Sequence, residues 1–121
     1  MSERSNRVQR VERELFVTLS EFLVHGLAVE LPCFVSITAV EVNPNLRHAK
    51  VFFRIVGEAA VAAEAKEILQ GERHQFQREV ARTLKTKFCP VLRFEFGVVG
   101  KSDPIDDMLE KLKRPAPGWG D

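Results

Sequence analysis

The sequence has few of the residues that mark a disulfide scaffold, a zinc site or a membrane protein. Its 121 residues include two cysteines, Cys33 and Cys89, with no C-x-x-C pair and no Cys/His spacing typical of zinc. We expect both to be small buried side chains in a reducing cytosol. The N-terminus lacks the apolar core of a secretory signal, and no apolar run reaches the roughly 18 residues of a membrane span. These absences predict a soluble, cytoplasmic protein without a membrane partner.

The sequence also lacks the motifs of the common catalytic sites. It contains no G-x-S-x-G, no Gly-rich phosphate loop, no dinucleotide fingerprint and no H-E-x-x-H. Four acidic residues near the C-terminus do not have the spacing of a calcium loop and indicate a solvated helix with charge pairs. They are Asp103, Asp106, Asp107 and Glu110. We expect no enzyme activity, no metal and no cofactor.

Charge is nearly balanced overall but unevenly distributed. The net charge is +1, and 45% hydrophobic with 29% charged residues is typical of a single globular domain. Residues 47–54 hold three Lys or Arg and no acid, whereas residues 73–93 hold six Lys or Arg and one Glu. Such segregated positive charge is typical of a nucleic-acid-binding face.

Apolar periodicity predicts three helices and three strands. Apolar steps of three or four indicate a helix and alternation indicates a strand. Gly26 is expected to end the first helix in the C′ position, and Pro44 with Asn45 to form a turn in which Asn tolerates the left-handed conformation. The expected elements are a helix at 5–25, strands at 34–42 and 48–55, helices at 58–70 and 72–87, and a strand at 91–99.

This α-β-β-α-α-β order predicts a two-layer α+β domain over residues 1–112. Helices cover one face of a three-stranded sheet, the first two strands form an antiparallel hairpin, and the direction of the third strand is open. Residues 104–112 are expected to form a short amphipathic helix or turn, with Ile105, Met108, Leu109 and Leu112 on one side. The Pro/Gly-rich residues 113–121 are expected to be a disordered tail.

The strand at 48–55 alternates between two kinds of side chain. Its odd-numbered residues, from Ala49 to Ile55, are apolar and predict a core face. Its even-numbered residues, from His48 to Arg54, are cations around Phe52, which is placed to stack on an unpaired base or to pack under the tail helix or a neighbour. His48 is placed to bind a phosphate or the turn backbone. The strand therefore predicts both a core and a candidate binding face.

The helix at 72–87 carries a second basic stripe. Its polar side holds His74, Arg78, Arg82 and Lys85 within about 80° of one another. Cations that neutralise phosphates give affinity independent of sequence, although a solvated basic face has the same pattern. The candidate RNA-binding residues are Arg47, His48, Lys50, Phe52, Arg54, His74, Arg78, Arg82, Lys85 and Lys87.

The element order resembles the type II K-homology fold, an RNA-binding architecture. The run VEVNPNLRHAKVFFRIVG, residues 40–57, closely resembles the central signature of the bacterial ribosome-binding factor A family. Similar runs lie on both sides, namely RVERELFVTLSEFL, REVARTLKTKFCPVLRFEF and IDDMLEKL. The resemblance covers about Arg7 to Leu112, nearly the whole chain.

The resemblance implies a ribosome assembly factor. Members of this family bind late precursors of the small ribosomal subunit and help the end of its rRNA mature, notably in the cold, without catalytic activity or a cofactor. It implies the small subunit and its rRNA as partners, alongside other assembly factors, for a protein that we expect to be monomeric. The alternative is an α+β interaction domain that mainly binds an acidic protein partner.

One family element differs in this chain. The family has a bent helix pair with Ala-x-Gly where ordinary K-homology domains have a Gly-x-x-Gly loop. Counting back from Pro90, those positions fall on Glu72, Arg73 and His74, just after Gly71. We expect the bend either at Gly71 or at a junction of another kind.

Overall fold

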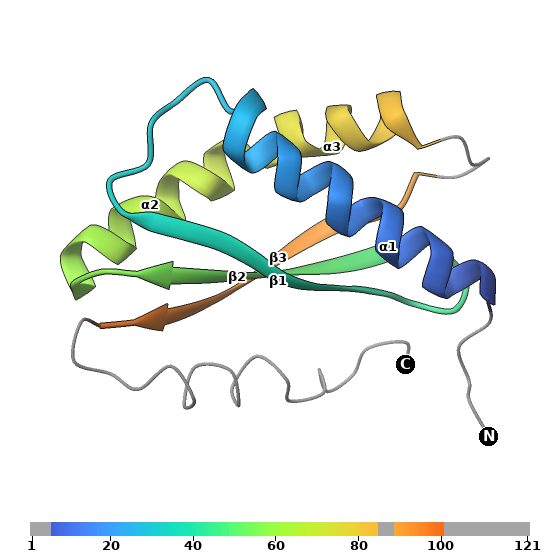
Figure 1. Ribbon diagram of the computed structural model, residues 1–121, viewed down its shortest axis with the longest axis horizontal. Helices are drawn as coiled ribbons and strands as arrows, with labels where there is room; N and C mark the ends of the chain where they lie inside the picture. Colours follow the sequence, from blue (N-terminus) through green and yellow to red (C-terminus); the bar gives the residue numbers. More distant parts are fainter. Residues whose placement is uncertain (1–5, 85–88, 101–121) are drawn as a thin grey trace.

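The computed structural model describes residues 6–84 and 89–100 and contains the predicted order of helices and strands (Figure 1). The second and third predicted helices are separate elements joined by one residue, Glu72. The elements are α1 (Asn6–Glu21) with a π-helical turn (Phe22–Gly26), β1 (Phe34–Val42), β2 (His48–Val56), α2 (Ala59–Gly71), α3 (Arg73–Thr83) and β3 (Val91–Val99).

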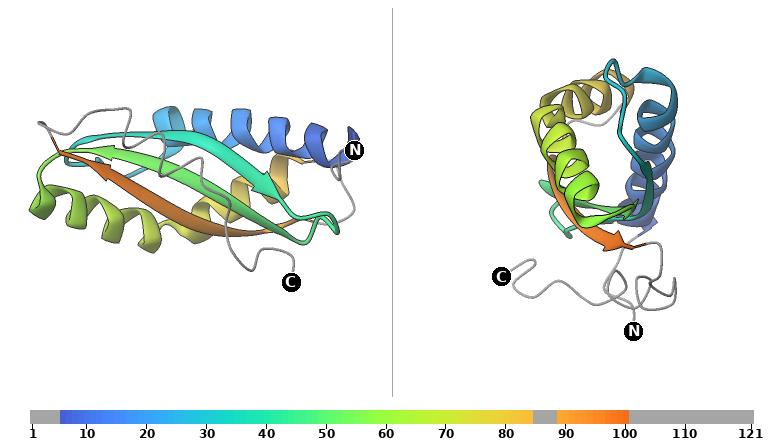
Figure 2. Two further views of the ribbon diagram at one scale, coloured as in Figure 1. Left: turned by 90° about the horizontal axis from the view of Figure 1, so that it is seen from below. Right: turned by 90° about the vertical axis from the view of Figure 1, so that its left-hand side faces the viewer.

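The three strands form one mixed sheet with β2 in the centre. β1 pairs with β2 antiparallel, as the hairpin predicted, and β3 pairs with β2 parallel, which settles the direction left open by the sequence. A parallel pair needs a crossover connection, which α2 and α3 supply. All three helices lie on one face of the sheet, as expected (Figures 1 and 2). The fold is the predicted two-layer α+β arrangement.

A β-bulge explains why β1 does not alternate simply. Its inward-facing residues Ile37, Val40 and Val42 are buried, so their spacing includes one step of three. The register shifts between Ile37 and Ala39, which leaves Thr38 as the extra residue. A bulge of this kind puts two residues opposite one and re-aims the side chains beyond it. Both halves of β1 therefore face the helices.

The inner face of β2 forms the centre of the core. The alternating residues from Ala49 to Ile55 are all 0% exposed, as the sequence predicted. The ring of Phe53 contacts Phe94 at 4.7 Å and Phe96 at 5.4 Å between centroids, and Phe76 of α3 lies at 6.1 Å. The contacts with Phe94 and Phe76 are edge to face and the contact with Phe96 is stacked, and aromatic pairs of both kinds add to the stabilisation from buried area alone. This cluster joins the sheet to the helical layer.

The first helix and its π-helical turn end at Gly26, which lies close to the ring of Phe22. Gly26 is the last residue of the π-helical turn and Leu27 is already extended, so Gly26 is not the left-handed C′ residue that we predicted. A Cβ at Gly26 would lie 2.5 Å from the ring of Phe22. That ring packs edge-on against Phe76 at 4.9 Å. Glycine is needed here because the ring occupies the space of a side chain.

The joint between α2 and α3 is a single residue. Glu72 has φ −96° and ψ 7°, and its N–H donates to the carbonyl oxygens of Ile68 and Leu69. Gly71 is still part of α2, so the bend follows it directly. A Cβ at Gly71 would meet nothing within 4 Å. The chain therefore bends without a loop and without a glycine requirement.

Alanine substitutions at Gly26 and Gly71 should change the stability of the fold in opposite directions. We expect Gly26→Ala to lower the free energy of unfolding by about 1–2 kcal/mol, because the new methyl group pushes the Phe22 ring off Phe76. The matched control Gly71→Ala should raise it by about 0.5 kcal/mol, because alanine loses less backbone entropy on folding than glycine does. Urea denaturation followed by circular dichroism measures both. Equal destabilisation by the two variants would contradict the role of Phe22.

The third helix is shorter than predicted. It ends at Thr83, and Leu84 is extended with φ −72° and ψ 133°, so the expected helix end at Lys87 is wrong. Val91 must pair with the start of β2, so the chain has to leave the helical layer early, and β-branched Thr83 favours helix only weakly. Lys85, Lys87, the predicted helix at 104–112 and the tail at 113–121 lie outside the described residues.

The two cysteines have different surroundings. Cys33 is half-buried beside Gly57, and burial raises the pKa of its thiol, with a further contribution from the charge of Glu64. Cys89 is exposed, so the expectation that both are buried is wrong for this residue. Its sulfur accepts a hydrogen bond from Gln77 Nε2 at 3.2 Å. Neither position forms a disulfide.

Candidate nucleic-acid interface

The β1–β2 turn is built around the side chain of Asn43. Asn43 is buried, and its Oδ1 accepts hydrogen bonds from the backbone N–H groups of Arg47 at 3.1 Å and His48 at 3.0 Å. Leu46 N–H donates to the Asn43 carbonyl at 2.9 Å, which closes the turn. The left-handed residue is Leu46, with φ 64°, rather than Asn45. Burial of the Leu46 side chain offsets a backbone cost of about 1 kcal/mol.

This turn places two of the predicted RNA-binding residues at the surface. Arg47 and His48 are exposed, and the Arg47 carbonyl accepts a hydrogen bond from Val91 N–H at 2.8 Å. The turn is therefore tied to the first residue of β3. His48 contributes to the turn through its backbone, whereas Asn43 supplies the side chain that ties it.

The predicted basic stripe on α3 is exposed over its described part. His74, Arg78 and Arg82 lie on the outer side of the helix, while Phe76 and Val80 face the core. Arg82 forms an ion pair with Glu79 at 2.9 Å and is still 72% exposed. An exposed pair of this kind is weak, so the guanidinium can exchange partners at little cost.

The outer face of β2 differs from the open platform that the sequence suggested. Lys50 and Phe52 are buried, at 6% and 7% exposure, and Arg54 is half-buried. The cross-strand partners include two acids, because Glu41 lies opposite Lys50 and Glu95 lies opposite Phe52. Burial favours the packing alternative for Phe52. The role of these three residues in RNA binding stays a prediction.

Three arginines on α1 were missed by the sequence reasoning. Arg7, Arg10 and Arg13 are exposed at steps of three along the helix. Acidic residues alternate with these arginines in the sequence, so a count of net charge does not reveal a basic surface. One of these acids, Glu12, is directed inward, where its Oε2 accepts a hydrogen bond from Val42 N–H at 2.9 Å. The apolar period of Val8, Val11 and Leu15 would have placed these arginines on the solvent side.

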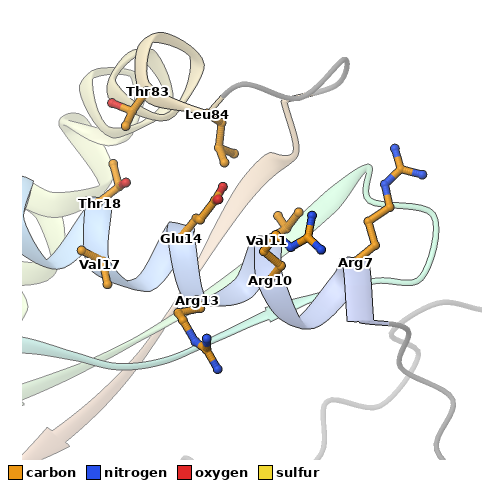
Figure 3. Close-up of a pocket in the computed structure, with 9 residues that line it drawn as sticks. All are labelled: Arg7, Arg10, Val11, Arg13, Glu14, Val17, Thr18, Thr83 and Leu84. Carbon is orange, nitrogen blue, oxygen red and sulfur yellow. The ribbon is translucent and has the colours of Figure 1, made fainter.

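These arginines line a hollow between α1 and the end of α3. The hollow has a volume of about 630 Å³ and extends to Thr83 and Leu84. Figure 3 shows Arg7 projecting outward at the start of α1 and Glu14 directed towards Leu84, with Arg13 turned away. The start of α1 and the β1–β2 turn lie at the same end of the molecule (Figures 1 and 2). Exposed arginines from two elements therefore occur at this end, near the end of α3.

The described residues hold no group of three His, Cys, Asp or Glu side chains arranged to bind a metal ion. Within the same residues, every helix is too short or too polar to span a bilayer.

The family model for ribosome-binding factor A matches residues 7–109. A relative of that name from Bdellovibrio bacteriovorus is 36% identical over 88 residues, which cover 73% of this chain and 66% of that protein. Another, from Anaeromyxobacter sp. (strain K), is 32% identical over 125 residues, which cover 93% of this chain and 91% of that protein.

Solved structures carry the same fold. The solution NMR structure of a Thermotoga maritima protein, described as a ribosome binding factor A, aligns with a TM-score of 0.64 at 25% identity and covers 78% of this chain and 91% of that one. The crystal structure of ribosome-binding factor A from Thermus thermophilus has a TM-score of 0.61 at 18% identity. The alignment covers 74% of this chain and 93% of that one. With the signature at residues 40–57 and the family match along most of the sequence, this chain belongs to the ribosome-binding factor A family.

Proposed function

We propose that this chain binds the small ribosomal subunit, or its late precursor, through rRNA and assists maturation of that rRNA without catalysing a reaction. Membership of a family named for ribosome binding supports the ribosome as the partner. The single observation that carries the RNA contact is the set of exposed arginines supplied by α1, the β1–β2 turn and α3. A protein with such a surface gains affinity for RNA because each neutralised phosphate releases condensed counterions.

Acidic and basic side chains are exposed on different helices of the α2–α3 pair. α2 exposes Glu64 and Glu67, with Lys66 between them, whereas α3 exposes Arg78 and Arg82. The proposed contact residues are therefore Arg7, Arg10, Arg13, Arg47, His48, His74, Arg78 and Arg82, with Lys85 and Lys87 retained from the sequence prediction. A polyanion is attracted to the surface that carries these cations and is repelled by the acidic residues of α2.

The one-residue joint at Glu72 determines how phosphates are held. A Gly-x-x-Gly loop clamps a nucleic-acid backbone with its main chain. Here α2 passes into α3 through Glu72 alone, so the contacts come from long side chains. Side-chain contacts of this kind position the protein on the RNA without reading a base sequence.

The proposed action is to hold an immature rRNA conformation until later factors or mature contacts displace the protein. Other nucleases perform the rRNA cleavages. Other assembly factors act on the same particle in the cytoplasm. Cold favours such a factor because misfolded rRNA helices persist longer at low temperature.

Salt dependence tests the proposal. If about five arginines neutralise phosphates, the affinity for small subunits should fall along a log-log slope of roughly −4, which is about a 10²-fold loss between about 50 and 200 mM salt. Cosedimentation with small subunits, and with protein-free small-subunit rRNA, measures it. Binding to subunits with a flat salt response and no affinity for naked rRNA would contradict the RNA contact and favour a protein partner.

A further inference from the structure

One edge of β3 has no neighbouring strand among the described residues. β3 pairs with β2 along its other edge, and α2 lies over this side of the sheet (Figure 2). Val91 N–H donates to the Arg47 carbonyl at 2.8 Å. The Val99 carbonyl accepts a hydrogen bond from Gly57 N–H at 2.9 Å. Alternate residues of a parallel ladder bond the same neighbour, so the odd-numbered residues of β3 face β2 and the even-numbered residues point their backbone groups outward.

The side chains of α3 close only the first part of this edge. Leu92 N–H donates to Gln77 Oε1 at 3.0 Å, and Arg73 Nη1 donates to the Leu92 carbonyl at 3.3 Å. No group within residues 6–84 and 89–100 makes such bonds with the outward backbone groups of Phe96 and Val98. Both residues are half-buried, so this part of the edge is within reach of a partner. A strand edge of this kind is a template for another extended segment.

A hollow lies beside this stretch of the edge. It has a volume of about 660 Å³ and is lined by Phe96 and by one side of α2. That side includes Ala60 and Ala63, whose small, exposed side chains leave room next to Phe96. The Phe96 ring stacks on Phe53 at 5.4 Å between centroids, which holds it in place. The hollow can therefore take an apolar side chain from a segment that pairs with β3.

The surroundings of the hollow are acidic. Glu64 and Glu67 line it, and Lys66 is the one cation among its described lining residues. Residues 58–72, which form α2 and its two flanking positions, contain four Glu and one Lys and so carry a net charge of −3. Such a surface repels phosphates and attracts cations. The charge therefore favours a basic protein segment over RNA at this edge.

We propose that an extended segment of a basic protein adds to the β3 edge at Phe96 and Val98. One of its apolar side chains fills the hollow beside Phe96, and its Lys or Arg residues pair with Glu64 and Glu67. Strand addition gains affinity from main-chain hydrogen bonds and specificity from pockets for alternate side chains. The arginines of α1, the turn and α3 remain available to RNA, so the two partners occupy different surfaces. This contact does not depend on RNA binding.

A short capped peptide in which valine alternates with lysine and arginine tests this contact on the full chain. In an NMR titration it should shift the amide signals of Phe96, Val98 and the exposed residues of α2. Hydrogen exchange at Phe96 and Val98 should slow about tenfold at saturation, because their N–H groups gain acceptors. The same peptide with methylated backbone nitrogens keeps its charge and side chains but lacks the N–H donors of a strand, and should not bind. Equal binding of the methylated peptide, with exchange at Phe96 and Val98 unchanged, would overturn the proposal.

Variants of α2 separate the shape of the hollow from its charge. Ala63→Leu fills the hollow with a residue that favours helix, so the fold should be retained while peptide affinity falls about tenfold. Glu64→Gln/Glu67→Gln should reduce the affinity about threefold to tenfold and make it less sensitive to salt. The matched control Lys66→Gln should not weaken binding. A loss from Lys66→Gln as large as that from the glutamate variant would contradict the proposed charge pairing.

A single-stranded oligouridine is the opposing probe. It should shift the signals of α1 and α3 and leave those of Phe96 and Val98 unchanged, even when the peptide is bound. If the oligouridine shifts Phe96 and Val98 and the peptide does not, the edge is a nucleic-acid site and the proposal fails. The peptide titration contains no RNA, so its failure leaves the proposed function intact, and a failed salt titration with small subunits leaves the peptide contact intact.

Discussion

Phe53→Ala is expected to lower the free energy of unfolding by about 3–5 kcal/mol. The ring is 0% exposed on the central strand and contacts rings from β3 and α3, so truncation leaves a cavity bordered by both layers. Neighbouring rings are held by their own contacts, such as Phe76 with Phe94 at 5.3 Å, and cannot collapse freely into the space. A domain of this size has a total stability of about 5–15 kcal/mol, so the loss is a large part of it.

Guanidinium denaturation at low temperature measures this change. The matched control is Phe34→Ala at the start of β1, because that ring is 59% exposed and should cost less than about 1 kcal/mol. If Phe53→Ala does not fold, Phe53→Leu keeps most of the volume and should cost about 1–2 kcal/mol. A loss at Phe53 no larger than at Phe34 would show that the cluster does not hold the two layers together.

Reversing charge at the proposed interface should have the largest effect on binding. We expect Arg10→Glu and Arg78→Glu each to reduce affinity for small-subunit rRNA about tenfold, and the double variant on the order of 10²-fold. Each change removes a phosphate contact and introduces repulsion, so the salt slope should become shallower by about one per site. Both side chains are exposed on different helices, and the fold should tolerate the changes.

Lys66→Glu on α2 is the matched control for these reversals. It makes the same change in net charge on an exposed helical residue, but between Glu64 and Glu67 on the acidic helix. Affinity should change by less than about threefold, because α2 faces away from the RNA in the proposed complex. A loss equal to that of Arg78→Glu would mean that net charge alone governs binding, and would contradict the proposed interface.

The sequence predicted the elements well where one period dominates. The inner face of β2 was identified because every second residue is apolar, and the spacing of Phe76 and Val80 identified the buried side of α3. The end of α3 was misplaced because it depends on where Val91 must pair with β2, a long-range requirement. The bulge at Thr38 became clear only from the register with β2.

The candidate interface was harder to predict because exposure and pairing are tertiary properties. Lys50 and Arg54 have no acid near them in sequence, yet Glu41 and Glu95 reach the same sheet face through strand pairing. The opposite error occurred on α1, where Glu12 offsets the arginines in a count of charges but points to the end of β1. Local charge counting therefore overestimated one basic surface and missed another.

The single residue between α2 and α3 also affects how the protein meets its partner. Because Glu72 joins the helices without a flexible loop, the acidic and the basic halves of the pair are held at a fixed separation. The molecule then carries a permanent dipole moment, and the field of a distant polyanion applies a torque to it. With RNA as the proposed partner, the protein should approach with α3 leading, and the association rate, more than the dissociation rate, should fall as salt is added.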